Sequence, residues 1–199
     1  MTTLEFPSVA SYEAKGLDRV RWAIADIVTI TCRNLIAMRR VPQVLVFSTI
    51  QPVIFILMFR YVFGWAIQGS LPPGQTYVNF LMPGIFVQTI VFGSLTTGVG
   101  LADDLSKGLI DRFRSLPMAR SAVLVGRTLA DLVRNFFVVV LMCVVGFIVG
   151  WTINTDAARF VAAFLIILAF AYSMSWAFAI VGLSVRDAET AQAVSFPFL

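Results

Sequence analysis

Four long apolar runs alternate with polar segments along this chain, and their lengths predict helices that cross a membrane. The runs cover approximately residues 44–65, 80–102, 132–151 and 160–185. A helix rises ~1.5 Å per residue, so about 20 apolar residues cross a ~30 Å hydrocarbon core. A fifth run, 191–199, is too short to cross, so we expect a truncated chain or a fragment of a longer protein. The pattern predicts an all-α, polytopic membrane protein.

The segment 12–41 has a helical period of its own. Charged residues recur every seven positions, at Arg19, Asp26, Arg33 and Arg40. Apolar-face positions follow steps of three or four, at Val20, Ile24, Ile27, Thr31 and Leu35. We predict an amphipathic helix lying in the headgroup region, with a solvent-exposed helix packed on a partner as the alternative. Residues 1–43 are then a cytoplasmic tail with this interfacial helix, and residues 44–199 a transmembrane domain.

The third helix is expected to begin before its apolar run, near Ser121. Arg127, Asp131 and Arg134 stand at i, i+4 and i+7, so they share a face and can pair. An exposed ladder of this kind contributes little to stability. Arg134 is expected at the inner membrane boundary. The second run carries four glycines, which permit close helix packing but also loosen a helix: Gly84, Gly93, Gly98 and Gly100.

The distribution of charge predicts the orientation in the membrane. Only 13% of the 199 residues are charged, against about 25% in a soluble domain. Six Lys or Arg precede the first run, six lie between residues 103 and 135, and one follows the fourth run. Two, Arg60 and Arg159, lie toward the other side. Thirteen against two places the N-terminus and the loop in the cytoplasm of a multi-pass cell-membrane protein.

The composition argues against an enzyme. The sequence has no His and no G-x-x-x-x-G-K-[ST] loop, so His-based nucleophiles, His-ligated metals and the usual phosphate cradle are excluded. Cys32 and Cys143 are far apart and are expected to be packing residues. Asp103 and Asp104 could be imagined as a magnesium site, but solvated side chains are the more common case. Basic residues stand in blocks beside apolar runs, which favours a membrane over nucleic acid.

Polar residues inside the runs are few: Gln51, Gln88, Thr89, Ser94, Thr96, Thr97, Ser173 and Ser175. They either bond between helices or line a path for an amphipathic substrate. The candidate path residues are Gln51, Gln88, Thr89, Ser94 and Ser173. The runs contain no carboxylate of the kind that an ion or proton relay needs, which weakens an ion-driven carrier.

The loop 103–131 is charged, rich in helical signals and unusually long for a cytoplasmic connection. Gly108 and Pro117 interrupt it, and Asp111, Arg112 and Arg114 crowd one turn between them. The pattern predicts a short helix presented below the membrane to a partner. A basic loop that binds anionic headgroups is the alternative, but its interleaved acids argue against lipid attraction alone.

This loop resembles the signature cytoplasmic loop of type-2 ABC exporter permeases, particularly the daunorubicin-resistance type of actinobacteria. The matching residues are Asp104, Leu105, Gly108, Asp111, Arg112, Arg114, Ser115, Leu116, Pro117, Met118, Arg120, Gly126, Arg127, Asp131, Arg134 and Asn135. The resemblance implies six spans, with re-entrant helices between the fifth and sixth. It also implies a coupling helix that seats in a groove on a separate ABC ATPase subunit.

The resemblance implies that this chain binds no cofactor and that the partner subunit binds ATP and magnesium. The expected coupling residues are Asp104, Gly108, Asp111, Arg112, Arg114, Pro117, Met118, Arg120 and Arg127. Further expected partners are a second permease copy or homologue, membrane lipid and an amphipathic small molecule, such as a drug, an antibiotic or a lipid. A non-transporting membrane scaffold and an ion-driven secondary carrier are the alternatives.

Overall fold

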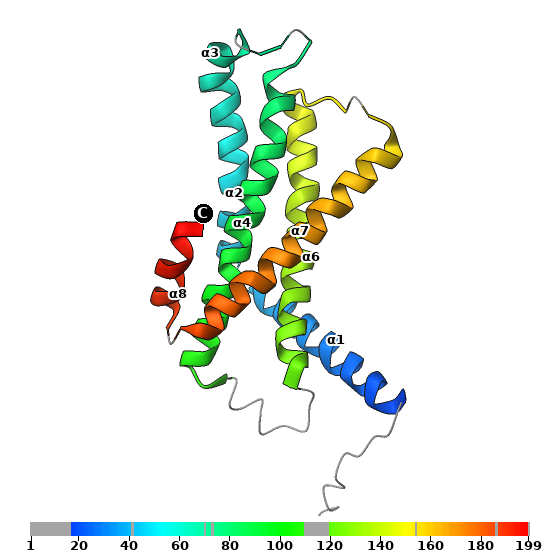
Figure 1. The fold of residues 1–199 in the computed structure, drawn as a ribbon, viewed down its shortest axis with the longest axis vertical. Helices are drawn as coiled ribbons and strands as arrows, with labels where there is room; N and C mark the ends of the chain where they lie inside the picture. Colours follow the sequence, from blue (N-terminus) through cyan, green and yellow to red (C-terminus); the bar gives the residue numbers. More distant parts are fainter. Residues whose placement is uncertain are drawn as a thin grey trace, which may run out of the picture.

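A computed structural model describes residues 17–40, 42–69, 71–72, 74–109, 120–153, 155–185 and 187–198, and the regular structure within these ranges is helical. Figure 1 shows long helices running side by side, with a diagonal helix across them. In chain order the elements are α1 (Leu17–Arg40), α2 (Pro42–Met58), the π-helix η1 (Phe59–Phe63), α3 (Gly64–Gln68), α4 (Tyr77–Ser106), α6 (Arg120–Val149), α7 (Ala157–Ser184), α8 (Ala188–Ser195) and the 3₁₀ turn η2 (Phe196–Phe198).

Four of the described helical segments are long and apolar enough to cross a membrane. They are Thr49–Gln68, Tyr77–Ser106, Ser121–Val149 and Ala157–Ser184. The prediction of an all-α, polytopic membrane protein is therefore confirmed. The third segment extends well before residue 132, because α6 continues without a break through its charged positions.

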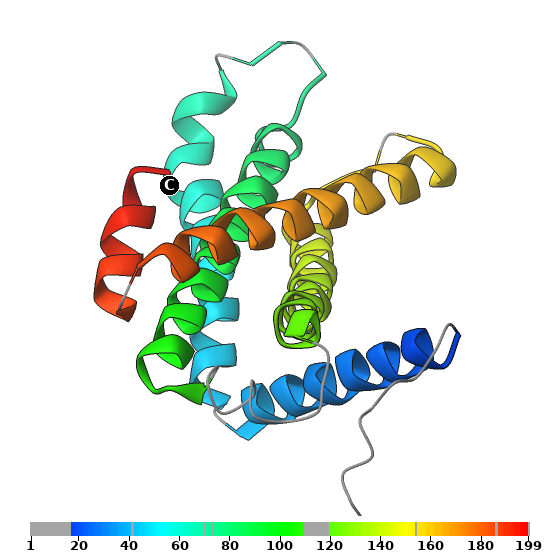
Figure 2. The same cartoon turned by 60° about the horizontal axis from the view of Figure 1, so that its bottom comes forward.

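Helix α1 lies across one end of the bundle rather than alongside the long helices (Figures 1 and 2). Its middle packs on α6, where Ile30 is buried and the Thr31 hydroxyl donates to the Gly126 carbonyl at 3.1 Å. Ile24, on the predicted apolar face, is 55% exposed, whereas Ile30, outside the predicted set, is buried. The rest of the protein therefore covers only part of the predicted face, and the location of α1 in the headgroup region stays a prediction. The tail and residues 12–16 of the predicted helix lie outside the described residues.

Two glycines end helices by adopting positive φ, which side chains disfavour. Gly150 (φ 101°) follows α6, and Trp151 N–H donates to the Gly146 carbonyl at 2.8 Å, as in a Schellman cap. Gly108 (φ 67°) follows α4 and donates its N–H to the Leu105 carbonyl at 3.0 Å. The long loop therefore leaves α4 at a residue whose conformation suits glycine.

An apolar core fills the half of the bundle farther from α1. It joins α2, α4, α6 and α7 through ten buried residues: Ile56, Val78, Met82, Ile85, Phe86, Ile90, Val139, Met142, Cys143 and Ala171. Phe86 also meets Trp151 edge-on, at 5.8 Å between ring centroids. Cys143 packs as predicted, whereas the prediction for Cys32 is wrong, because α1 leaves its thiol exposed.

Helix α7 crosses α4 at very short range. A Cβ at Gly98 would lie 2.5 Å from the Phe178 carbonyl oxygen, and one at Gly182 would collide with the Gly98 backbone. Small residues allow such approach in lipid, where close packing replaces the hydrophobic effect between helices. α8 then packs against α4, with Ala191 and Ser195 buried. Close packing, rather than loosening, is thus what Gly98 provides.

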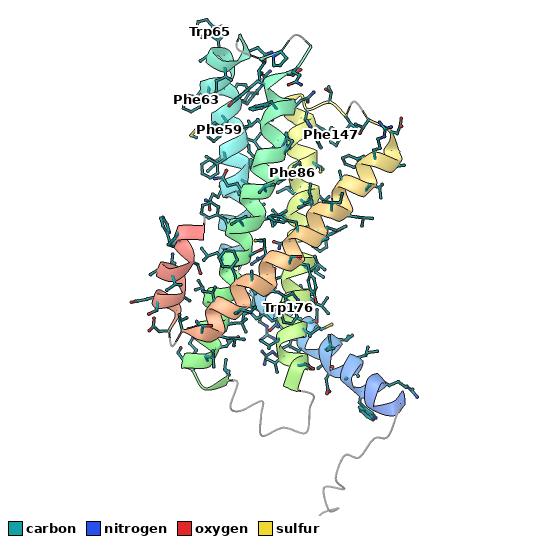
Figure 3. All side chains as sticks on the ribbon, viewed as in Figure 1. Phe59, Phe63, Trp65, Phe86, Phe147 and Trp176 are labelled. Carbon is teal, nitrogen blue, oxygen red and sulfur yellow. The ribbon has the colours of Figure 1, made fainter. Side chains whose placement is uncertain are left out.

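The outer edge of α2, η1 and α3 is apolar and exposed. Figure 3 shows Phe59, Phe63 and Trp65 along this edge, with Trp65 at its far end. Trp65 is 94% exposed and Tyr61 73% exposed. Aromatic side chains with a polar atom favour the membrane–water boundary, so this end is suited to lie at the interface opposite α1.

Candidate functional site

Polar side chains gather between α4 and α6 in the half of the bundle nearer α1. Together with the Gly93 carbonyl they form what we call the α4–α6 polar ladder: Gly93, Thr96, Thr97 and Asp104 of α4 with Arg127, Asp131 and Arg134 of α6. The two helices run antiparallel, so the ladder starts where the long loop joins them and extends toward the middle of the bundle (Figure 1). It brings together residues that are distant in the sequence, where the sequence predicted pairs along α6 alone.

The first pair of the ladder joins the helix ends nearest the loop. Arg127 Nη1 donates to Asp104 Oδ2, and both side chains are largely buried, at 21% and 27% exposure. Gly100 provides the space, because a Cβ there would collide with the Arg127 guanidinium. Asp104 and Arg127 were both expected coupling residues. The pairing between helices was not predicted, since it depends on which helix faces α6.

The second pair is almost completely buried. Asp131 Oδ2 accepts from the Thr97 hydroxyl at 2.6 Å, and Asp131 Oδ1 lies 3.6 Å from Arg134 Nη1. Asp131 is 1% exposed and Arg134 is 9% exposed. Asp131 lies just before the predicted apolar run 132–151, within the helical segment Ser121–Val149, so the prediction that the apolar runs lack a carboxylate stays a prediction. Arg134 and the Thr97 hydroxyl compensate the charge of Asp131, so this carboxylate does not favour an ion-driven carrier.

The third group ends the ladder at a cleft. Arg134 donates through Nη1 to the Thr96 hydroxyl and through Nη2 to the Gly93 carbonyl, both at 2.7 Å. The absence of a side chain at Gly93 leaves room here, since a Cβ would lie 3.0 Å from Asn135 Oδ1. Arg134 is thus fixed between α4 and α6 and also lines the cleft.

The cleft lies between α2, α4 and α6 and has a volume of ≈ 630 Å³. Its lining is mostly apolar, and Gln51, Gln88 and Thr89 contribute polar groups. The structure therefore brings three of the five candidate path residues together. Ser94 is buried on α4, and its hydroxyl has no hydrogen-bond partner in the described part of the chain. Ser173 lies apart on the exposed side of α7, where it donates to the Ala169 carbonyl at 2.9 Å.

Most of the expected coupling residues belong to the segment that the structure does not describe. Asp111, Arg112, Arg114, Pro117 and Met118 lie outside the described residues, and Arg120 begins α6 without a described side chain. Asp104, Gly108 and Arg127 stand at the two helix ends that lead into this segment. α1 also contacts this region, because Thr31 bonds to Gly126 next to Arg127. The role of Thr31 was not predicted.

Asp103, beside the ladder, is exposed to solvent as expected and pairs with a cation. Lys107 Nζ lies 2.6 Å from Asp103 Oδ2, an exposed i, i+4 contact at the end of α4. This hydrogen bond and the nearby charge raise the pKa of Lys107 above its usual range. Among the described residues no three His, Cys, Asp or Glu side chains gather as metal ligands would.

Four apolar helical segments, an amphipathic helix across one end and a charged loop between α4 and α6 define a polytopic, all-α membrane protein. The chain belongs to the ABC-2 type transporter family, whose match covers residues 25–199. No solved structure matches the chain significantly.

Three similar proteins are named as permeases. The chain is 33% identical over 181 residues to a daunorubicin resistance ABC transporter permease protein, DrrB1, of Streptomyces coeruleorubidus, covering 89% of this chain and 63% of the relative. It is 27% identical over 111 residues to the doxorubicin resistance ABC transporter permease protein DrrB of Mycobacterium tuberculosis, covering 56% and 38%. A putative transport permease, ycf38, of Cyanophora paradoxa is 25% identical over 146 residues, covering 73% and 50%. The chain thus spans less than two thirds of the length of these relatives.

Proposed function

We propose that this chain is the membrane-embedded part of an ATP-driven exporter that moves an amphipathic small molecule out of the cytoplasm. A separate ABC ATPase subunit binds ATP and magnesium, and the loop 103–131 docks on it. A second copy of the permease, or a homologue, completes the transport unit. The family match and the names of the relatives support this assignment.

The α4–α6 polar ladder is the observation that carries the proposal. Motion imposed on the loop reaches α4 and α6 first, because the loop joins these two helices. The ion pair of Asp104 with Arg127 connects α4 to α6 near the loop. Hydrogen bonds of Arg134 connect the same two helices at the cleft. Buried charge pairs have strict geometric requirements, so a displacement at the loop is passed on as a shift of helices instead of being absorbed by side chains. The cleft would then change shape when the ATPase moves the loop.

Reconstitution with the ATPase subunit tests this function. The permease and its ATPase, placed together in liposomes, should stimulate ATP hydrolysis and accumulate an amphiphile in an ATP-dependent way. Arg114→Glu, in the loop, should uncouple hydrolysis from transport without affecting membrane insertion. Transport that proceeds unchanged with Arg114→Glu would contradict the assigned role of the loop.

The two alternatives make different predictions in the same assay. A membrane scaffold need not co-purify with an ATPase subunit and would accumulate nothing. A secondary carrier would transport the amphiphile after ATP depletion and would stop when the ion gradient is collapsed. The pairing of Asp131 with Thr97 and Arg134 gives the carrier no unpaired carboxylate within the ladder.

A further inference from the structure

The cleft between α2, α4 and α6 is electrostatically one-sided. Of the described residues that line it, Arg134 alone carries a charge. Asp131 does not line the cleft: its carboxylate accepts from the Thr97 hydroxyl and lies 3.6 Å from Arg134 Nη1, and its side chain is 2% exposed. A head group entering the cleft therefore meets the cation first. The opposing charge is farther away, so it only partly cancels the attraction.

The polar end of the cleft is rich in hydrogen-bond donors. A guanidinium has five N–H groups, and the described hydrogen bonds of Arg134 use one on Nη1 and one on Nη2. Beside it, Asn135 is 4% exposed, and its Nδ2 has no hydrogen-bond partner in the part of the chain that the structure describes. A buried donor without an acceptor is costly, so it marks a place where an acceptor from outside the chain would be stabilised.

The rest of the cleft suits an apolar body of moderate size. Ile54, Phe55, Phe92 and Val138 form much of its wall. Its volume of ≈ 630 Å³ lies within the range of pockets that hold drug-sized ligands. The charged end and the apolar wall together match a molecule with an acceptor head and an apolar body.

We propose that this cleft binds drug-sized amphiphiles through an anionic, oxygen-rich head group, such as a carboxylate, sulfonate or phosphate, and disfavours organic cations. Arg134 is the residue that determines this specificity, and Asn135 supplies a second donor. The inference rests on the proposed export function, because it names the class of substrate that the same cleft accepts. Its basis is the arrangement of charge around the cleft.

Matched fluorescent probes test the preference directly. Three probes share one alkyl chain and end in a sulfonate, a hydroxyl or a trimethylammonium group, so that their charges do not depend on pH. Binding to the permease in phosphatidylcholine nanodiscs is measured by anisotropy, with empty nanodiscs as the baseline. The sulfonate should bind about tenfold more tightly than the ammonium, with the hydroxyl between them. Equal binding, or tighter binding of the ammonium, would overturn the proposal.

Variants locate the preference within the molecule. Arg134→Gln should remove most of the difference between sulfonate and ammonium, whereas Arg159→Gln, which deletes an exposed cation on α7, should leave it intact. Because Arg134 also bonds to α4, a second variant avoids the ladder. Ile54→Trp narrows the cleft from α2 and should weaken the sulfonate and ammonium probes alike. The proposed site would be refuted if Arg134→Gln left the preference for the sulfonate over the ammonium unchanged. It would also be refuted if Ile54→Trp left the affinity of both probes unchanged.

Two further arms separate other outcomes. Replacing part of the lipid by phosphatidylglycerol should leave the wild-type to Arg134→Gln affinity ratio for the sulfonate unchanged. A ratio that falls to about one would mean that bilayer lipid occupies the cleft, and this outcome would contradict the proposal. ATP-dependent export is measured in parallel. Sulfonate-selective binding without export refutes the exporter function and supports the proposed preference of the cleft for anions. Export of cations in preference to anions supports the exporter function and refutes that preference.

Discussion

Asp104 and Arg127 connect α4 and α6 near the loop that joins these helices, and their contribution to stability can be measured. Reversing either charge alone places like charges together in a site that is about three-quarters buried. The expected loss is about 2 kcal/mol, between the values for exposed and fully buried pairs. The double reversal Asp104→Arg with Arg127→Asp should recover most of it, as a double-mutant cycle on thermal unfolding would show.

The neighbouring pair of Asp103 and Lys107 is the matched control. It has the same charges but is exposed, at 42% and 62% for the two side chains. Lys107→Ala should therefore leave the unfolding midpoint unchanged within error. If substitutions in both pairs lowered the unfolding midpoint equally, the burial of Arg127 beside Gly100 would add nothing to the stabilisation by its ion pair.

Asp131 compensates a buried cation, so removing its charge should be costly. Asp131→Asn retains an oxygen that can accept from Thr97 but leaves Arg134 without its counter-ion. Breaking a buried pair in this way costs about 3–5 kcal/mol. Thermal unfolding in detergent measures the loss. Adding Arg134→Met should restore part of it, because neither position then carries a charge, and failure to do so would argue against mutual compensation.

At the scale of elements, the crossing of α4 and α7 depends on two facing glycines. Gly182→Ala adds a methyl group that collides with the Gly98 backbone, and overpacking of this kind costs about 1–3 kcal/mol. Gly84→Ala on α4 is the control, since a Cβ there meets nothing within 4 Å and the helix propensity improves. Thermal unfolding of the two variants should shift in opposite directions. A neutral Gly182→Ala would mean that α7 is free to move away.

The N-terminus of α8 depends on an ionised carboxylate. Asp187 accepts from the Thr190 N–H at 2.7 Å, and this bond lowers the pKa of Asp187 below its usual range. A lowered pKa stabilises the cap above the unfolded-state pKa, and that stabilisation is lost as the pH falls through the lower folded value. Asp187→Ala should speed amide exchange at Thr190 at neutral pH. Unchanged exchange would show that packing on α4 alone holds this end.

Helix lengths could be predicted from the sequence because an apolar run long enough to cross a bilayer has few other stable forms in lipid. The start of α6 could also be predicted, near Ser121 against the observed Arg120, but the burial of its charged side chains could not. Asp131 and Arg134 look like boundary residues when α6 is considered alone, and only Thr97 and Gly93 on α4 explain their burial. The same limit applies to the candidate path. Periodicity assigns a residue to a face of its own helix, but it does not identify the neighbour, so Gln88 and Ser173 look equivalent in the sequence.

The orientation of the whole molecule rests on the distribution of Lys and Arg. α1 and the loop ends of α4 and α6 share one end of the bundle, as this distribution requires if that end is cytoplasmic (Figure 1). In a cysteine-free background, Lys107→Cys should react with an impermeant maleimide only after the cells are permeabilised. Gln75→Cys, at the other end of α4, should react in intact cells. The reverse pattern would place the docking loop outside and rule out an ATPase partner.

The burial of Asp131 and Arg134 in α6 also has a consequence for biogenesis. On insertion scales each such charge near a helix centre opposes entry from the translocon by about 2.5–3.5 kcal/mol. α4 precedes α6 in the chain, so Thr96, Thr97 and the Gly93 carbonyl have already been synthesised when α6 leaves the ribosome. The order of the helices thus supplies the compensating partners before the segment that needs them reaches the bilayer.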